Sequence, residues 1–307
     1  MTAEQVQLCG SKEIQIISIF SYSVLGNEGG STLGRISENL NKSRSIINEF
    51  LHIGYAKWDD LIARLENFET KNLNELEDEQ LWTFLLRCGY AASGADGVQL
   101  LSELLTGEKV SRKSDRKIWF EVLPIPPREN EGNTHLDLAI GDISLRDRTC
   151  SGIVLSCTEN PWVCFCEMKW NADISTTVSY DVTRNQLIRV IENAICFQSR
   201  QNQYADAIYV TMVTPAIFNP SSRKSRLYQY KFEEYSCNAS MILSDIQDCA
   251  LCENKSFPGW KYPTDLVQRI SCLKLNWISF EQLFENLLPS VLKDDLSCFW
   301  NKYRKKG

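Results

Sequence analysis

Apolar and polar positions in the first third of the chain follow the spacing of amphipathic helices. Between residues 31 and 68, leucine, isoleucine and phenylalanine recur at intervals of three and four, which predicts an apolar helical stripe. Residues 72–88 predict a second helix, with acidic residues in its early turns as the helix dipole favours, and residues 94–109 predict a third. The pattern therefore predicts an N-terminal helical region over residues 1–90.

Short apolar runs typical of strands replace this pattern further along the chain. They are separated by polar turns, and one amphipathic segment lies between the last two. This order predicts an α/β fold in which helices flank a mixed central β-sheet. The predicted strands cover residues 117–125, 134–143, 152–156, 162–170 and 205–218, and the helix covers 181–200 with Asp181 or Thr183 as its cap.

The last third of the chain mixes aromatic, basic and amphipathic segments. The Tyr-rich stretch RLYQYKFEEY (226–235) is interpreted as a strand; as it follows the basic run 221–226, it could alternatively stack nucleic-acid bases. A helix is expected around residues 237–250. Residues 273–288 predict a short strand followed by an amphipathic helix that Ser279 caps.

Composition narrows the class of protein. The chain has 307 residues, of which 43% are hydrophobic, and it contains no apolar run of about 18 residues, so no membrane helix is expected. The first residues do not resemble a signal peptide, and the twelve scattered cysteines are typical of reduced, mostly buried thiols. We therefore expect a cytoplasmic protein.

The net charge and the small number of histidines argue against several classes of function. A net charge of −6 argues against a protein that coats nucleic acid non-specifically, although the basic runs 111–117, 221–226 and 303–306 could be phosphate contacts as well as solvated loops. Only two histidines are present, which weakens the case for His-rich zinc hydrolases and restricts any Ser-His-Asp triad. Any catalysis must therefore rest mainly on carboxylates, lysines or cysteines.

One group of residues has the composition of a phosphodiester-cleaving site. Asp137 lies on one predicted strand, and Glu167 and Lys169 lie on the end of a later one, where residues i and i+2 point to the same face roughly 6–7 Å apart. Two carboxylates can hold Mg²⁺ or Mn²⁺, which polarises a phosphate and lowers the pKa of bound water. A lysine beside them can orient or deprotonate that water, or stabilise developing charge. The alternative is a solvated strand end.

These residues resemble the motif of the PD-(D/E)XK nuclease superfamily, which has a restriction-endonuclease-like fold. The match consists of Asp137 in HLDLAIGD, Glu167 and Lys169 in CFCEMKW, and Gln186 in TRNQLIRVIENA. The resemblance implies that Asp137 and Glu167 bind the metal, that Lys169 is the catalytic lysine, and that Gln186 steadies the site from its helix. It also places an auxiliary acid at Glu103, on the preceding helix.

The chain departs from the motif before its first acid, where Leu136 replaces proline. Asp142 lies five residues after Asp137 and competes for the ligand role; we prefer Asp137, because strand alternation turns it away from Leu136 and Leu138. His135 is either a phosphate contact or a bystander.

The resemblance implies a Mg²⁺- or Mn²⁺-dependent nuclease domain over residues 91–307. It favours DNA over RNA, a role in restriction or antiviral defence, and a homodimer or a partner protein, without a membrane. Two alternatives stay open. One is a catalytically silent nuclease fold that binds nucleic acid or acts as a scaffold. The other is a zinc-dependent interaction protein built on Cys249 and Cys252, with Cys237 and Cys272 as further ligands.

Overall fold

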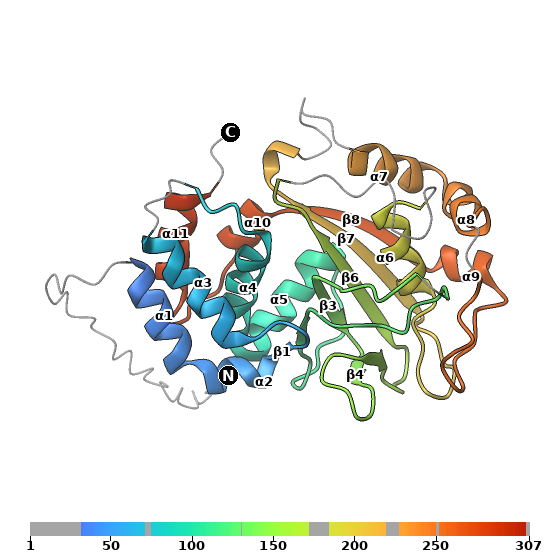
Figure 1. Cartoon of the computed structure of the whole chain (residues 1–307), viewed down its shortest axis with the longest axis horizontal. Coiled ribbons are helices and arrows are strands. Elements are labelled where there is room, and N and C mark those ends of the chain that lie inside the picture. Colours follow the sequence, from blue (N-terminus) through green and yellow to red (C-terminus); the bar gives the residue numbers. More distant parts are fainter. Residues whose placement is uncertain are drawn as a thin grey trace, which may run out of the picture. The chain divides into compact units, whose positions relative to one another are not determined.

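A six-stranded mixed β-sheet in the order β1–β2–β3–β6–β7–β8 forms the centre of the computed structural model (Figure 1). β1 is parallel to β2, β3 is antiparallel to both of its neighbours, and β6, β7 and β8 are parallel. The structure describes residues 32–70, 75–129, 131–171, 184–218, 227–249 and 252–304. The sheet strands are β1 (Leu51–Ile53), β2 (Ile118–Phe120), β3 (Leu138–Gly141), β6 (Trp162–Met168), β7 (Ala207–Thr214) and β8 (Leu273–Ser279); β4 (Ile143–Leu145) and β5 (Ile153–Leu155) form a separate pair.

Helices cover both faces of this sheet because its strands alternate apolar side chains toward each face. On β3, Leu138 and Ile140 join one core cluster, whereas Ala139 joins the other. The first cluster holds α1 (Thr32–Lys42), α2 (Arg44–Phe50), α3 (Trp58–Thr70), α4 (Glu79–Ala91), α5 (Gly94–Thr106), α10 (Phe280–Glu285) and α11 (Lys293–Tyr303). The second holds α6 (Gln186–Ile195), which connects β6 to β7, with α7 (Leu227–Cys237), α8 (Ala239–Gln247) and α9 (Leu266–Ser271) (Figure 1).

An aromatic cluster joins the N-terminal helices to the end of the chain. The ring of Trp82 on α4 lies 5.2 Å from that of Trp170, just beyond β6, and 5.1 Å from that of Trp300 on α11. Phe284 on α10 stacks on Trp300 at 4.4 Å. Buried aromatic pairs of this kind each contribute about 0.5–1.5 kcal/mol beyond the area they bury. They hold α4 beside the C-terminal end of β6.

The α/β class, the helix-flanked mixed sheet and the N-terminal helical region agree with the sequence prediction, within the part of the chain described. The cap at Ser279 is also confirmed: its side chain accepts a hydrogen bond from the backbone N–H of Gln282, and the Gln282 side chain accepts one from the backbone N–H of Ser279. The first part of the predicted N-terminal helical region, residues 1–31, lies outside the described residues.

Three predictions about element ends or types are wrong. The second helix begins at Glu79 and not near residue 72, because Asp78 caps it. Asn185 caps α6 through the backbone N–H of Ile188; Asp181 and Thr183, the predicted caps, lie outside the described residues. The Tyr-rich stretch forms helix α7 rather than a strand.

All cysteines in the described part of the chain are free thiols, as the scattered spacing predicted. The prediction that they are mostly buried is wrong: among the described cysteines only Cys88, Cys164, Cys166 and Cys196 are buried, because the others lie in loops or at element ends, apart from Cys298, which is exposed on α11. Among the described helices, none is long and apolar enough to cross a membrane.

Candidate active site

Asp137 and Glu167 lie at the same end of two neighbouring antiparallel strands. The register pairs Leu138 of β3 with Cys166 of β6, so Asp137 and Glu167 are the next cross-strand neighbours. The backbone N–H of Met168 donates a hydrogen bond of 2.8 Å to Oδ2 of Asp137, which fixes this carboxylate against β6. The structure therefore brings together two acids that are distant in sequence.

Lys169 completes this group. Its Nζ lies 2.7 Å from Oε1 of Glu167, as expected for side chains two residues apart on one strand face. Both are buried, with 2% of Glu167 and 7% of Lys169 exposed, so this is not a solvated strand end. A buried ion pair of this kind demands close geometry, because desolvating both charges is costly.

A third acid, Glu79, approaches from the first turn of α4. Its Oε1 lies 3.6 Å from Nζ of Lys169, and its Oε2 accepts a hydrogen bond of 2.6 Å from the backbone N–H of Trp170. Glu103, which the resemblance suggested for an auxiliary acid, instead accepts a hydrogen bond from Gln99 on its own helix. Glu79 was not predicted as a site residue; its only local feature is its position directly after the helix cap Asp78.

The electrostatics of the group follow from burial. Burial raises the pKa of Asp137 well above its usual range, and the nearby charge of Glu167 raises it further. Burial also raises the pKa of Glu167, against the opposing effect of Lys169. Burial alone would lower the pKa of Lys169, but Glu167, Asp137 and Glu79 together raise it above its ordinary value. Lys169 therefore stays protonated at neutral pH.

Arg87 of α4 contacts the backbone of the site, a role that was not predicted from the sequence. It is fully buried, donates a hydrogen bond to the backbone carbonyl of Asp137, and lies 3.8 Å from the ring centroid of Phe120. Burial lowers its pKa, while the charges of Asp137 and Glu121 oppose that shift. Arg87 thus holds the end of β3 that carries Asp137.

A cavity of about 350 Å³ opens beside Asp137. No lysine or arginine is among its described lining residues, so an anionic substrate entering it would be repelled unless a cation were bound there. Its acidic lining residues are Glu77, Asp78, Glu79, Glu121 and Asp137.

The other predicted residues lie apart from this group. Gln186 is the half-buried first residue of α6, and within the described residues no hydrogen bond or ion pair joins its side chain to Glu167 or Lys169. His135 lies 3.6 Å from a carboxylate oxygen of Glu121 and is largely exposed. Asp142 lies at the opposite end of β3, where its side chain accepts a hydrogen bond from the backbone N–H of Trp162, so it does not compete with Asp137.

The donor set can be compared with the needs of a metal ion. Within the described residues, no group of three or more His, Cys, Asp or Glu side chains lies close enough together to hold one, and this includes Cys249 and Cys252. Mg²⁺, however, is often held by one or two carboxylates and keeps several waters. Asp137 and Glu167 supply two such oxygens, and the only ion pairs to this group's acids come from Lys169 among the described residues. This surplus of negative charge fits a divalent cation.

A scan against protein-family models found no match to this chain, and searches of curated proteins and of solved structures found none either.

Proposed function

We propose that this protein is a metal-dependent nuclease that hydrolyses phosphodiester bonds of DNA, built on a restriction-endonuclease-like core. The observation that carries the proposal is the buried Glu167–Lys169 ion pair beside Asp137, at one end of two adjacent strands. Burying this many charges in one place is costly, because each must be taken out of water. Perturbed pKa values at such a group are typical of functional sites.

Each residue has a distinct role in the proposal. Asp137 and Glu167 would hold the cation, whose chemistry is to polarise the phosphate and to lower the pKa of water. Glu79 positions Lys169 through the 3.6 Å contact between their charged atoms. Arg87 keeps the backbone of Asp137 in place. The proposed role of Gln186, at the start of α6, in steadying the site rests on the resemblance to the motif alone.

The electrostatics favour one role for Lys169 over the others. A lysine that acts as a general base must release its proton near neutral pH, which requires a lowered pKa. In the metal-free protein the three surrounding carboxylates instead raise the pKa of Lys169. We propose that its ammonium group stabilises negative charge that develops on the phosphate and orients the attacking water.

The wider biological role rests on the resemblance. Restriction or antiviral defence is the role that we propose, with DNA preferred over RNA. One such site cuts one strand, so cleavage of a duplex would require a homodimer or a partner protein. The acidic cavity beside Asp137 supports a substrate that binds only with the cation in place.

A cleavage assay tests the proposal. Wild type would be incubated with plasmid, linear duplex, single-stranded DNA and RNA, with Mg²⁺, Mn²⁺ or EDTA. Glu167→Gln keeps the shape of the side chain, removes its charge and should abolish cutting. Glu77→Gln is the matched control, because Glu77 lines the same cavity but is exposed, and it should cut like wild type.

Metal binding separates the proposal from a silent nuclease fold. Calorimetry with Mg²⁺ and Mn²⁺ should show binding to wild type and to Glu77→Gln, and greatly weakened binding to Glu167→Gln. A folded wild type that binds neither metal and cuts no substrate would contradict the nuclease proposal and favour the scaffold role.

A further inference from the structure

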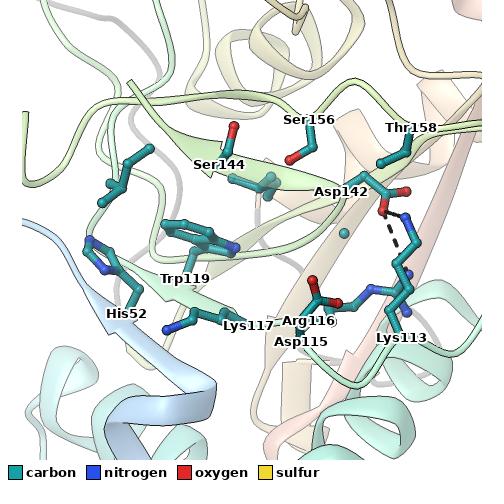
Figure 2. Close-up of a pocket in the computed structure, with 13 residues that line it drawn as sticks. His52, Lys113, Asp115, Arg116, Lys117, Trp119, Asp142, Ser144, Ser156 and Thr158 are labelled. Carbon is teal, nitrogen blue, oxygen red and sulfur yellow. Dashed lines mark hydrogen bonds and ion pairs between the residues drawn. The ribbon is translucent and has the colours of Figure 1, made fainter. Parts of the chain in front are cut away.

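A second cavity lies at the opposite end of β3 from Asp137. It has a volume of about 400 Å³, and its walls come from the residues before β2, the turn after β3 and strand β4 (Figure 2). Asp137 precedes β3 and Asp142 follows it, so at about 3.3 Å per residue the two places are about 17 Å apart along the strand. This cavity is therefore separate from the candidate active site.

Three basic side chains line this cavity, whereas no lysine or arginine is among the described lining residues of the cavity beside Asp137. Lys113, Arg116 and Lys117 line it, all from the basic run 111–117. Asp142 and Asp115 also line it, but Asp142 is already engaged: it accepts hydrogen bonds from Lys113 and from the backbone N–H of Trp162. Figure 2 shows Lys113 turned onto Asp142, with Lys117 on the other side of Asp115.

Two buried side chains at this cavity carry N–H groups that have no hydrogen-bond acceptor among the described residues. Arg116 is 4% exposed; its Nε and Nη2 lack an acceptor, and its nearest carboxylate oxygen, on Asp142, is 4.0 Å from Nη2. Trp119 is 5% exposed, and its Nε1 likewise lacks an acceptor. Leaving a buried donor unpaired costs about 1–3 kcal/mol, and more for a charged one. Both side chains line the cavity, but these atoms are covered, so a ligand oxygen would reach them only once the side chains turn toward it.

We propose that this cavity binds a small phosphate monoester. Phosphate oxygens are strong acceptors, and arginine is well suited to them. Arg116 and Lys117 supply the charge, and the indole N–H of Trp119 supplies a neutral donor. Ser144 and Ser156 line the side of the cavity opposite Lys117 (Figure 2).

The size of the cavity indicates that the ligand carries an organic part. Pockets for small organic ligands start at about 300 Å³, and an inorganic phosphate ion would leave much of this one empty. Ile143 and Leu145 line the remaining wall and would contact apolar atoms of the ligand. A phosphorylated sugar or a mononucleotide meets both requirements.

Calorimetry with defined probes tests this proposal. Wild type in EDTA, which keeps the candidate active site free of metal, would be titrated with ribose 5-phosphate, adenosine 5′-monophosphate, adenosine and inorganic phosphate. We expect at least one monoester to bind one-to-one, about tenfold or more tighter than either adenosine or phosphate, since about 1.4 kcal/mol of added contacts gives that factor. Failure of both monoesters to bind would overturn the proposal.

Variants locate the binding. Lys117→Glu should weaken monoester binding at least about tenfold. Lys109→Glu makes the same charge change at an exposed position just before the basic run, outside the cavity lining, and should leave binding unchanged. Equal effects of the two variants would overturn the proposal, because they would indicate only non-specific attraction.

A further variant and a competitor complete the test. Trp119→Phe removes the indole donor and keeps an aromatic ring, so a folded variant, checked by thermal unfolding, should bind the monoester more weakly. An unphosphorylated single-stranded oligonucleotide should not compete. Competition as strong as that of the monoester would contradict the proposal and favour a nucleic-acid strand as the occupant. None of these outcomes depends on whether the chain cuts DNA.

Discussion

Nζ of Lys169 lies 3.6 Å from Oε1 of Glu79, so α4 contributes a carboxylate to a group whose other charges come from the sheet. The contact ties the N-terminal helical region to the end of β6. It also gives this region a second role besides packing, because the second oxygen of Glu79 accepts a hydrogen bond from the backbone N–H of Trp170. One side chain therefore fixes both the lysine and the strand end that follows it.

Neutralising Glu79 should impair the site without unfolding the protein. Glu79→Gln retains an oxygen for the backbone N–H of Trp170 but loses the charge beside Lys169. Supporting residues of metal sites typically contribute about 10- to 100-fold to activity or metal affinity. We expect a loss of this size in DNA cleavage, measured against Glu77→Gln as control. Equal activity of the two variants would show that Glu79 has no positioning role.

The raised pKa of Asp137 should make the stability of the metal-free protein depend on pH. Its ordinary pKa is 3.8, and burial raises it in the folded state. Above 3.8 the folded protein therefore binds more protons than the unfolded chain. As a result, the free energy of unfolding falls as pH rises through this window, up to the raised pKa.

Asp137→Asn removes this titration and retains an acceptor for the backbone N–H of Met168. In EDTA, the Tm of the variant should exceed that of wild type increasingly as pH rises above 3.8 toward the raised pKa of Asp137. The two proteins should converge at lower pH, where Asp137 is protonated in both states. Thermal unfolding curves that stay parallel over the whole range would contradict a raised pKa at this position.

The sequence predicts much of the candidate site because the site lies on strands. Alternation at the end of β6 places Glu167 and, one residue beyond the strand, Lys169 on one face, and the apolar run that follows Asp137 indicates the neighbouring strand β3. Glu79 and Arg87 could not be predicted, because their contacts depend on how α4 packs against the sheet. Packing of that kind leaves no local pattern in the sequence.

The error at α7 has a different physical cause. Tyrosine and phenylalanine favour strands, and residues 226–235 contain four of them. Tertiary contacts decide otherwise: Tyr228 and Tyr235 are buried on one helical face, and the ring of Phe232 packs at 5.0 Å against Trp277 of β8. Tyr228 and Tyr235 are seven residues apart, so in a helix both face the core cluster on this side of the sheet.

Close packing of α4 against α5 predicts the effect of one small substitution. A Cβ atom at Gly97 would overlap the backbone carbonyl oxygen of Tyr90 and lie 2.9 Å from Cβ of Ser93. Gly→Ala in a helix normally stabilises by about 0.5–1 kcal/mol, whereas overpacking costs about 1–3 kcal/mol. We expect Gly97→Ala to lower the free energy of unfolding in urea. A more stable variant would show that the helices separate readily at this point.

The buried charges around Arg184 should matter more to stability than any exposed ion pair. Its guanidinium contacts Glu131 at 2.8 Å and Glu192 at 2.7 Å, and all three side chains are completely buried. These contacts connect the chain just before α6 to the helix itself and to the loop that precedes β3. Glu131 also contacts Arg189 at 3.1 Å and Glu192 also contacts Arg128 at 2.7 Å, so each carboxylate keeps one arginine when Arg184 is removed. The expected loss is therefore that of a hydrogen bond to a charged group, about 1.5–3 kcal/mol.

Arg184→Met should therefore lower the free energy of unfolding in urea by about 1.5–3 kcal/mol. The matched control is Arg200→Met, which removes a pair with Asp147 whose side chains are 49% and 75% exposed, and which should cost less than about 1 kcal/mol. Similar losses in the two variants would contradict a stabilising network at Arg184.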